Sequence, residues 1–217
     1  MSEALPFDPD CRACPRLATF LSEVRATRPD YHTAPVPGFG VTEARLLVVG
    51  LAPGMHGANR TGRPFTGDHA GLLLYDTLYQ FGFSNQPHGD DPDDGLELYD
   101  ARIVNAVRCL PPENKPKGEE IRRCNSYLKH DLNCLPERGV VLALGQVAHQ
   151  AIVRALGLRQ KDYLFGHGHE FCLSDGRLLL DTYHCSRYNT QTRRLTPEMF
   201  QGIFARARAH LESVEPS

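Results

Sequence analysis

Residues 45–54 read RLLVVGLAPG, an apolar run that ends in a glycine-rich turn. A short apolar run bounded by turn residues predicts a strand that is buried on both of its faces. Four runs in the chain share this character, and they cover residues 45–50, 101–107, 140–145 and 178–184. Strands that are apolar along their whole length are typical of a parallel sheet with helices on both sides.

Stretches with a helical spacing of apolar residues separate these runs. They cover about residues 70–81, 118–132 and 147–156, and a last helix follows Thr196, which can cap it. The alternation predicts an α/β protein with a single three-layer α/β/α domain over residues 1–217, built on a central, mainly parallel four-stranded sheet. Residues 82–94 and 110–117 read as loops, and the first loop reads as a surface excursion.

Composition and charge give only broad limits. The 217 residues are 41% apolar and 23% charged, as in ordinary globular proteins. No apolar run approaches the ~20 residues of a membrane span. Residues 1–6 lack the basic and apolar regions of a signal peptide, so we expect a cytosolic protein.

The net charge of -2 does not indicate a nucleic-acid partner. DNA contact would therefore need local patches, and each of these reads most simply as solvated surface: Arg60–Arg63, Lys115–Lys117, Arg122–Arg123, Arg187 and Arg193–Arg194.

Unusual side chains follow the predicted strands. In open α/β sheets, ligands bind outside the carboxyl ends of the strands. The strand assignment therefore places Ala52, Asn105, Gln146 and His184 at one rim of the sheet. We take this rim as the candidate site.

Asn105 and His184 each have two interpretations. Asn105 lies in an apolar strand, where its amide must find partners. It either bonds loop backbone or presents an acceptor and a donor side by side, as the pairing edge of uracil requires. His184 is either a structural histidine or a donor to a carbonyl oxygen that gains negative charge as a base departs.

The glycine-rich segment after the first strand does not match the common phosphate-binding motifs. No Gly-Lys-Ser/Thr follows it, and it lacks the G-x-G-x-x-G spacing. Glycine in such a turn allows the backbone to approach a ligand closely. Phe65, further along the same segment, reads by default as a core or turn residue.

Seven cysteines are many for a cytosolic chain of this size, and disulfides are rare in that compartment. Cys11 and Cys14 form a C-x2-C pair, and Cys109 and Cys124 lie far along the chain. Four thiolates can bind zinc or a [4Fe–4S] cluster, and a site without metal also remains open. Cys134 and Cys172 read as small buried thiols.

These motifs together resemble the uracil-DNA glycosylase superfamily, most closely its family 5, the type-B branch. The resemblance covers nearly the whole chain, and its most specific part is Gly50–Asp68. Residues 104–109 resemble the base-recognition strand of the superfamily, and residues 144–148 its phosphate-contacting turn. His184-Cys185-Ser186 stands where His-Pro-Ser is usual.

The resemblance implies a monofunctional glycosylase that hydrolyses the N-glycosidic bond of uracil in DNA and starts base excision repair. It implies that Phe65 stacks on the extruded base, that Asn105 reads its edge and that His184 stabilises the departing base. Gly54 stands where stricter enzymes have a bulky ring, so the pocket should also admit other deaminated bases such as hypoxanthine. We expect a monomer that binds DNA containing such bases, with no membrane partner.

The resemblance also implies metal ligands, candidates for positioning water, and DNA-binding residues. It implies a [4Fe–4S] cluster on Cys11, Cys14, Cys109 and Cys124. Ala52 stands where relatives position the attacking water, so Asp68 is the first candidate for that task and Asn59 the second. The resemblance further implies that Gly145, Gln146 and Ser186 contact DNA phosphates. The segment Ser186, Arg187, Tyr188 and Asn189 stands where the family inserts side chains into the gap that the base leaves in the duplex.

Two other functions remain as hypotheses. The methyl side chain of Ala52 cannot position an attacking water molecule. The chain could therefore be a non-catalytic nucleic-acid-binding module that keeps the cluster and the pocket. A zinc-bearing α/β hydrolase of free nucleotides is the other hypothesis.

Overall fold

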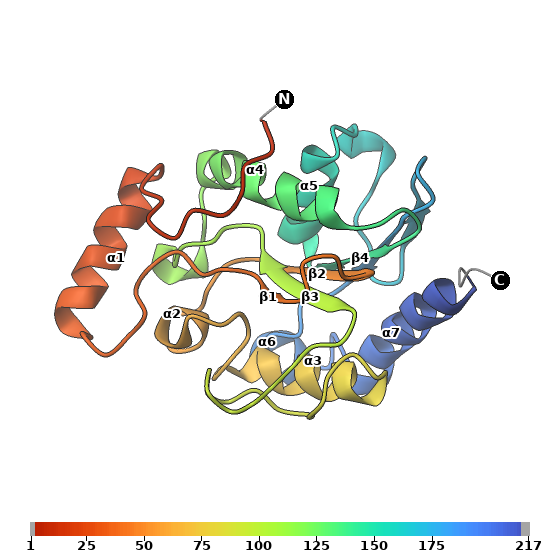
Figure 1. Ribbon diagram of the computed structural model, residues 1–217, viewed down its shortest axis with the longest axis horizontal. Coiled ribbons are helices and arrows are strands. Elements are labelled where there is room, and N and C mark those ends of the chain that lie inside the picture. Colours follow the sequence, from red (N-terminus) through yellow and green to blue (C-terminus); the bar gives the residue numbers. More distant parts are fainter. Residues whose placement is uncertain (1–2, 214–217) are drawn as a thin grey trace.

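A twisted sheet of six strands, in the order β1-β3-β2-β4-β6-β5, forms the centre of the protein (Figure 1). The structure is a computed structural model, and it describes residues 3–213. The strands are β1 (Phe39–Gly40), β2 (Leu46–Gly50), β3 (Ala101–Asn105), β4 (Val140–Leu144), β5 (Glu170–Cys172) and β6 (Leu178–Thr182).

The four predicted strands are present and parallel, as β3-β2-β4-β6. The expected strand number was wrong, because the antiparallel strands β1 and β5 extend the two edges. These edge strands have two and three residues and expose part of their surface, so neither produces an apolar run. The last strand also ends at Thr182 rather than His184, because the chain leaves the ladder there and the Tyr183 N–H donates to His167 Nδ1 at 3.3 Å.

Seven α-helices surround the sheet in the described part of the chain. They are α1 (Pro15–Thr27), α2 (Ala58–Thr61), α3 (His69–Gln80), α4 (Gly118–Cys134), α5 (Gln146–Ala155), α6 (Arg187–Gln191) and α7 (Pro197–Glu212). The sequence predicted α3, α4, α5 and α7, and Thr196 caps α7 as expected, since its hydroxyl accepts from the Met199 N–H at 3.2 Å. It did not predict α1, α2 or α6; α2 and α6 have only four and five residues.

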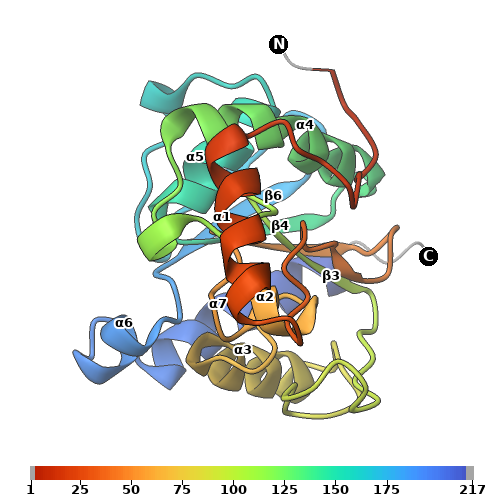
Figure 2. The same ribbon diagram turned by 90° about the vertical axis from the view of Figure 1, so that its left-hand side faces the viewer.

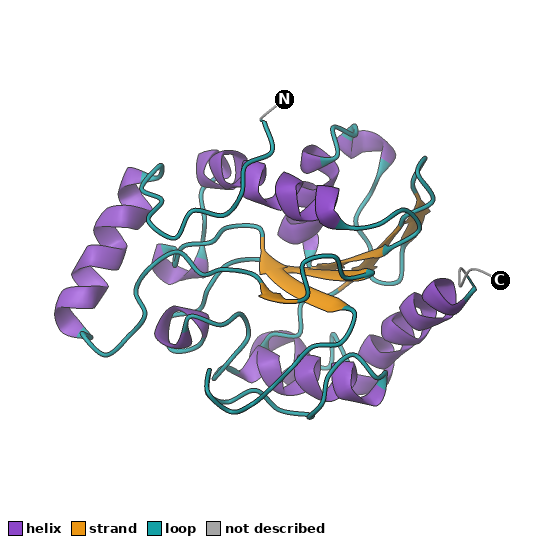
Figure 3. Cartoon of the chain, viewed as in Figure 1, coloured by secondary structure: helices purple, strands orange, loops and turns teal. Residues whose placement is uncertain are grey.

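Successive side chains of each strand point to opposite faces of the sheet, so the sheet has a separate hydrophobic core on each face. Leu46 and Val48 of β2 face a core shared with α3 and α7, whereas Leu47 and Val49 face a core shared with α4 and α5. Figure 3 shows the resulting helix–sheet–helix layers. The three-layer α/β/α arrangement is therefore confirmed. Within residues 3–213, none of the helices combines the length and apolar character that crossing a bilayer requires.

Helix α1 lies at the end of these layers, next to α4 (Figure 2). The Arg16 guanidinium donates to both carboxylate oxygens of Glu120 at 2.8 Å, and Arg123 Nη1 donates to the Ala13 carbonyl at 2.7 Å. These contacts attach the N-terminal segment to α4.

The first predicted loop is only partly a surface excursion. Phe83 is fully buried, and the Gly67 N–H donates to the Gly89 carbonyl at 3.2 Å. The loop therefore packs against the segment that carries Phe65.

Candidate active site

A small pocket of ≈ 40 Å³ lies at the carboxyl ends of β2, β3 and β6. Its lining consists of Ala52, Gly54, Ala58, Phe65, Asp68, Ala70, Asn105 and His184. The sequence placed Ala52, Asn105 and His184 at one rim, and the structure brings them together. Ala58 and Ala70 were missed, because an alanine that only shapes a wall carries no chemical signal in a sequence.

Asn105 is paired with Gly50 in the register of β2 and β3. Its amide oxygen Oδ1 is buried and has no hydrogen-bond partner among the described residues. A Cβ atom on Gly50 would lie 2.5 Å from this oxygen and 2.7 Å from Cζ of Phe65. Gly50 thus allows the amide and the ring to approach the same point. The interpretation in which Asn105 Oδ1 bonds loop backbone is not supported, and an unpaired buried acceptor is a functional candidate.

Phe65 lines the same pocket as Asn105 and His184. Its ring is stacked with the His184 ring at a centroid distance of 5.9 Å and an interplanar angle of 27°. The residue is buried, as the default interpretation expected, but it also forms a wall of the pocket. Its φ angle is +57°, in the left-handed region that side chains other than glycine rarely adopt. Such strained residues concentrate at functional sites.

His184 is neutral at physiological pH. Burial lowers its pKa to about 4, because an apolar environment disfavours the charged imidazolium. The backbone carbonyl of His184 accepts a hydrogen bond from Asn189 Nδ2 at 2.8 Å, which anchors this turn. A neutral imidazole can donate one hydrogen bond without placing a positive charge in the pocket.

Asp68 is the pocket's carboxylate. It caps α3, because its Oδ1 accepts from the Gly71 N–H at 3.1 Å. Its Oδ2 lies on the side of the Gly57 backbone, where a Cβ atom would come within 2.5 Å of it. Burial raises the pKa of Asp68, and hydrogen bonds from the backbone at Gly71 and Ala70 partly oppose this.

Asn59 does not line the pocket. It is fully buried in α2, and neither polar atom of its side chain has a hydrogen-bond partner among residues 3–213. Of the two expected candidates for positioning water, the structure therefore places only Asp68 in the pocket.

The residues expected to bind DNA lie next to His184. A Cβ atom on Gly145 would lie 3.4 Å from Cβ of His184, and Gln146 begins α5. Ser186 caps α6 by accepting from the Asn189 N–H at 3.4 Å. Arg187 and Tyr188 are exposed on this helix, and Tyr188 is 70% exposed.

The position of Arg63 differs from the prediction that the basic patch Arg60–Arg63 is solvated surface. It is buried, 6% exposed, and it forms an ion pair with Asp94. It is therefore neither solvated surface nor free to contact DNA phosphate.

The four cysteines Cys11, Cys14, Cys109 and Cys124 surround a second cavity of ≈ 130 Å³. Leu17, Val107 and Tyr127 contribute apolar walls to it. Burial and the neighbouring thiols raise the pKa of Cys109 to about 12, and burial raises the pKa of Cys124 to about 11. Thiolates are costly here without a compensating cation, so the environment fits a bound metal group.

The remaining cysteines differ from expectation. Cys172 is exposed and Cys134 is half-buried, whereas Cys185 is fully buried in the main core. The interpretation of Cys172 as a buried thiol was wrong, because it lies on the short edge strand β5.

A comparison with protein families decides the assignment. The model of the uracil DNA glycosylase superfamily matches residues 37–208, which include the whole lining of the pocket. The chain belongs to the uracil DNA glycosylase superfamily. The family expected from the sequence is thus confirmed, and with it the enzyme class, a glycosylase.

Curated relatives support the same branch of the family. A Type-5 uracil-DNA glycosylase of Thermus thermophilus is 49% identical over 91% of this chain and 92% of its own length. One from Mycobacterium leprae is 42% identical over 91% of this chain and 90% of its own length. A Type-4 uracil-DNA glycosylase of Sulfurisphaera tokodaii is 28% identical over 80% of this chain and 74% of its own length.

Proposed function

We propose that this chain removes uracil from DNA by hydrolysing the bond between the base and the deoxyribose, and that it thereby starts base excision repair. The observation that carries the proposal is the convergence of Phe65, Asn105 and His184 on one pocket. The family assignment and the Type-5 relatives support the substrate.

The base must first leave the helical stack, because the glycosidic bond is inaccessible within a duplex. Extrusion costs a few kcal/mol and is easiest at a mismatch such as G·U. Gly145, Gln146 and Ser186 are available to contact phosphates beside the pocket. Arg187 and Tyr188 project from α6 and can fill the gap that the base leaves.

Recognition of the base combines stacking with reading of its edge. The Phe65 ring stacks on the extruded base. The unpaired Oδ1 of Asn105 accepts from the ring N–H of uracil, and Nδ2 donates to the neighbouring carbonyl oxygen. Cytosine presents an acceptor and a donor in the opposite order, so it leaves both amide groups unsatisfied.

Cleavage proceeds by departure of the base. As the bond between the sugar carbon and the base nitrogen breaks, its electron pair moves onto the base, and the neutral His184 donates a hydrogen bond to the carbonyl oxygen that gains charge. Asp68 orients a water molecule that adds to the cationic sugar, and the proton released by this water neutralises the base anion. The products are a free base and an abasic site. Among the described residues no lysine lines the pocket, so we expect no strand cleavage through a Schiff base.

The four-cysteine cavity is proposed to hold a [4Fe–4S] cluster. Among the described residues, no group of three or more His, Cys, Asp or Glu side chains is arranged to hold a metal ion. Four thiol groups around one cavity suit a cluster in which each thiolate binds a different iron. The cluster would attach α1 to α4. A brown colour of the purified protein supports iron–sulfur, whereas a colourless zinc-loaded protein contradicts it.

The pocket is also proposed to accept other deaminated bases. At Gly54, a Cβ atom would meet only Asp68 Oδ2, at 3.6 Å, so this wall leaves room for a larger base. Hypoxanthine is the proposed second substrate. The enzyme is further proposed to act as a monomer, which light scattering with and without DNA tests directly.

The proposal is tested with oligonucleotides that contain uracil or hypoxanthine, single-stranded and paired, followed by alkaline cleavage of abasic sites. Uracil release from the G·U duplex is the expected result. Binding without release would instead support the non-catalytic module. Release from free nucleotides alone would support the nucleotide hydrolase.

A further inference from the structure

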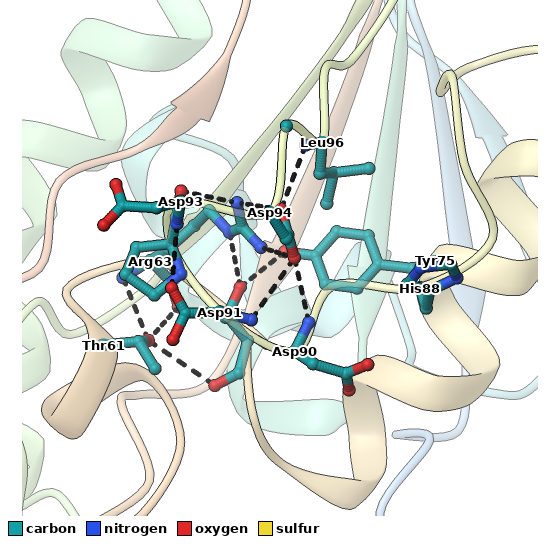
Figure 4. Close-up of polar contacts among 12 residues, drawn as sticks. Thr61, Arg63, Tyr75, His88, Asp90, Asp91, Asp93, Asp94 and Leu96 are labelled. Carbon is teal, nitrogen blue, oxygen red and sulfur yellow. Dashed lines mark hydrogen bonds and ion pairs between the residues drawn. The ribbon is translucent and has the colours of Figure 1, made fainter.

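Arg63 and Asp94 form an ion pair between the segment that carries Phe65 and the loop after α3 (Figure 4). Arg63 Nη1 donates to Asp94 Oδ1 at 2.9 Å, and Nη2 donates to Oδ2 at 2.7 Å. The two side chains are only 7% and 14% exposed. Paired bonds of this kind fix the direction of both groups as well as their distance.

The Arg63 guanidinium also holds the residue after Phe65. Its Nε donates to the hydroxyl of Thr66 at 2.6 Å. On the other side, the hydroxyl of Tyr75 donates to the carbonyl of Pro64 at 2.5 Å. Both neighbours of Phe65 are therefore fixed by buried polar groups.

This restraint acts on a strained residue. Phe65 has a φ angle of +57°, which an aromatic residue does not adopt without support. Its carbonyl packs against α3 so closely that a Cβ atom on Gly71 would lie 1.9 Å from the oxygen. A strained conformation persists only where the surrounding structure determines it from several sides.

The other end of the pair is equally fixed. The carboxylate of Asp94 accepts from three backbone N–H groups, those of Asp90 at 3.0 Å, Asp91 at 3.3 Å and Leu96 at 3.0 Å. Burial opposes its ionisation, but the hydrogen bonds from Arg63 and from the backbone hold the pKa of Asp94 at about 2. The guanidinium of Arg63 also lies 5.0 Å from the centroid of the Phe39 ring on β1.

We propose that Arg63 and Asp94 are positioning residues that hold the Phe65 ring at the wall of the pocket, ready to stack on an extruded base. This inference rests on the role of Phe65 in the proposed function. A preorganised ring needs no rearrangement when the base arrives, whereas a displaced ring weakens stacking and misaligns the glycosidic bond. Misplacement by about 1 Å can lower a rate about a hundredfold.

A purely structural role for the pair predicts a different pattern. If the pair only supports the loop, breaking it lowers activity to the same extent whether or not residue 65 has a ring. If the pair acts through the ring, breaking it has little effect once the ring is absent. The two cases are separated by combining substitutions.

The experiment measures single-turnover uracil release from a G·U duplex, over hours where necessary. Asp94→Asn is compared in the native chain and in a Phe65→Ala background. We expect a loss of about 10- to 100-fold in the native chain and less than twofold in the background. Asp93→Asn is the matched control, because Asp93 is exposed on the same loop and loses the same charge; it should leave the rate unchanged.

Equal losses in both backgrounds would overturn the inference, as would an unchanged rate in Asp94→Asn. If that variant does not fold, Arg63→Lys replaces it, since lysine keeps the charge but cannot form the two parallel bonds to Asp94. Failure of the proposed function has another signature: the native chain releases no uracil, or Phe65→Ala by itself releases it at the native rate.

Discussion

The pocket and the four-cysteine cavity are close to each other, because Ala52 lines the pocket and packs against the apolar cluster that borders the cavity. The pocket is held by polar contacts of the protein itself, including the Asp68 cap, the anchor from Asn189 and the Arg63–Asp94 pair. The cavity has apolar walls and thiols whose ionisation is opposed by burial. The reaction site is thus held by polar contacts of the protein, whereas the four-cysteine cavity is the site proposed above for a metal cluster.

The largest effect is expected from removal of the imidazole in the pocket. His184→Ala should lower single-turnover uracil release about 10²- to 10³-fold, because a lost donor to a developing anion costs this much. Binding of abasic DNA should change little. His88→Ala is the control, because His88 is exposed on the loop after α3. Native turnover in His184→Ala would remove this residue from the mechanism.

A large effect of another kind is expected at the second site. Cys109→Ser should abolish the brown colour that the proposed cluster predicts and make residues 3–40 sensitive to limited proteolysis, because loss of that cluster would weaken the attachment of α1 to α4. Cys134→Ser should keep the colour, since Cys134 lies outside the cavity. His184→Ala should keep the colour while it loses turnover. A Cys109→Ser protein with normal iron content and normal resistance to proteolysis would contradict the proposal that the cysteine cavity holds a cluster that supports the N-terminal segment.

A smaller effect is expected on selectivity. Asn105→Asp replaces the donor of the amide by a second acceptor, so the preference for uracil over cytosine should fall by about 10- to 100-fold, as expected for an unsatisfied buried hydrogen bond of about 1–3 kcal/mol. Competition between uracil and cytosine duplexes measures this ratio. An unchanged ratio would favour a structural role for Asn105.

The smallest effect concerns pH. Burial raises the pKa of Asp68 above the ordinary value of 3.8. The ionised carboxylate of Asp68 accepts a hydrogen bond from water more strongly than the protonated acid does, so the rate should rise with pH through an acid limb that lies above 3.8. Asp68→Asn keeps a side-chain cap on α3 and should lose this acid limb, because the amide does not ionise. An acid limb that persists in the pH–rate profile of Asp68→Asn would show that another ionisable side chain causes it.

Sequence reasoning found those parts of the molecule that have a local pattern. The four central strands are continuous apolar runs, and the strand ends placed Asn105 and His184 at one rim. The strands β1 and β5 are too short for any periodicity. The partnership of Arg63 with Asp94 spans 31 residues and joins a basic patch to an acidic loop, each of which reads as solvated surface. Only the folded chain shows that these charges meet.

The central claim is that Phe65, Asn105 and His184 act on one extruded base. A crystal structure of the protein with a duplex that contains 2′-fluoro-deoxyuridine, whose glycosidic bond resists hydrolysis, tests it most directly. We predict that the uracil lies against the Phe65 ring, with its edge bonded to the Asn105 amide and a carbonyl oxygen near His184. A uracil that remains stacked in the duplex, or that occupies another cavity, would contradict the account.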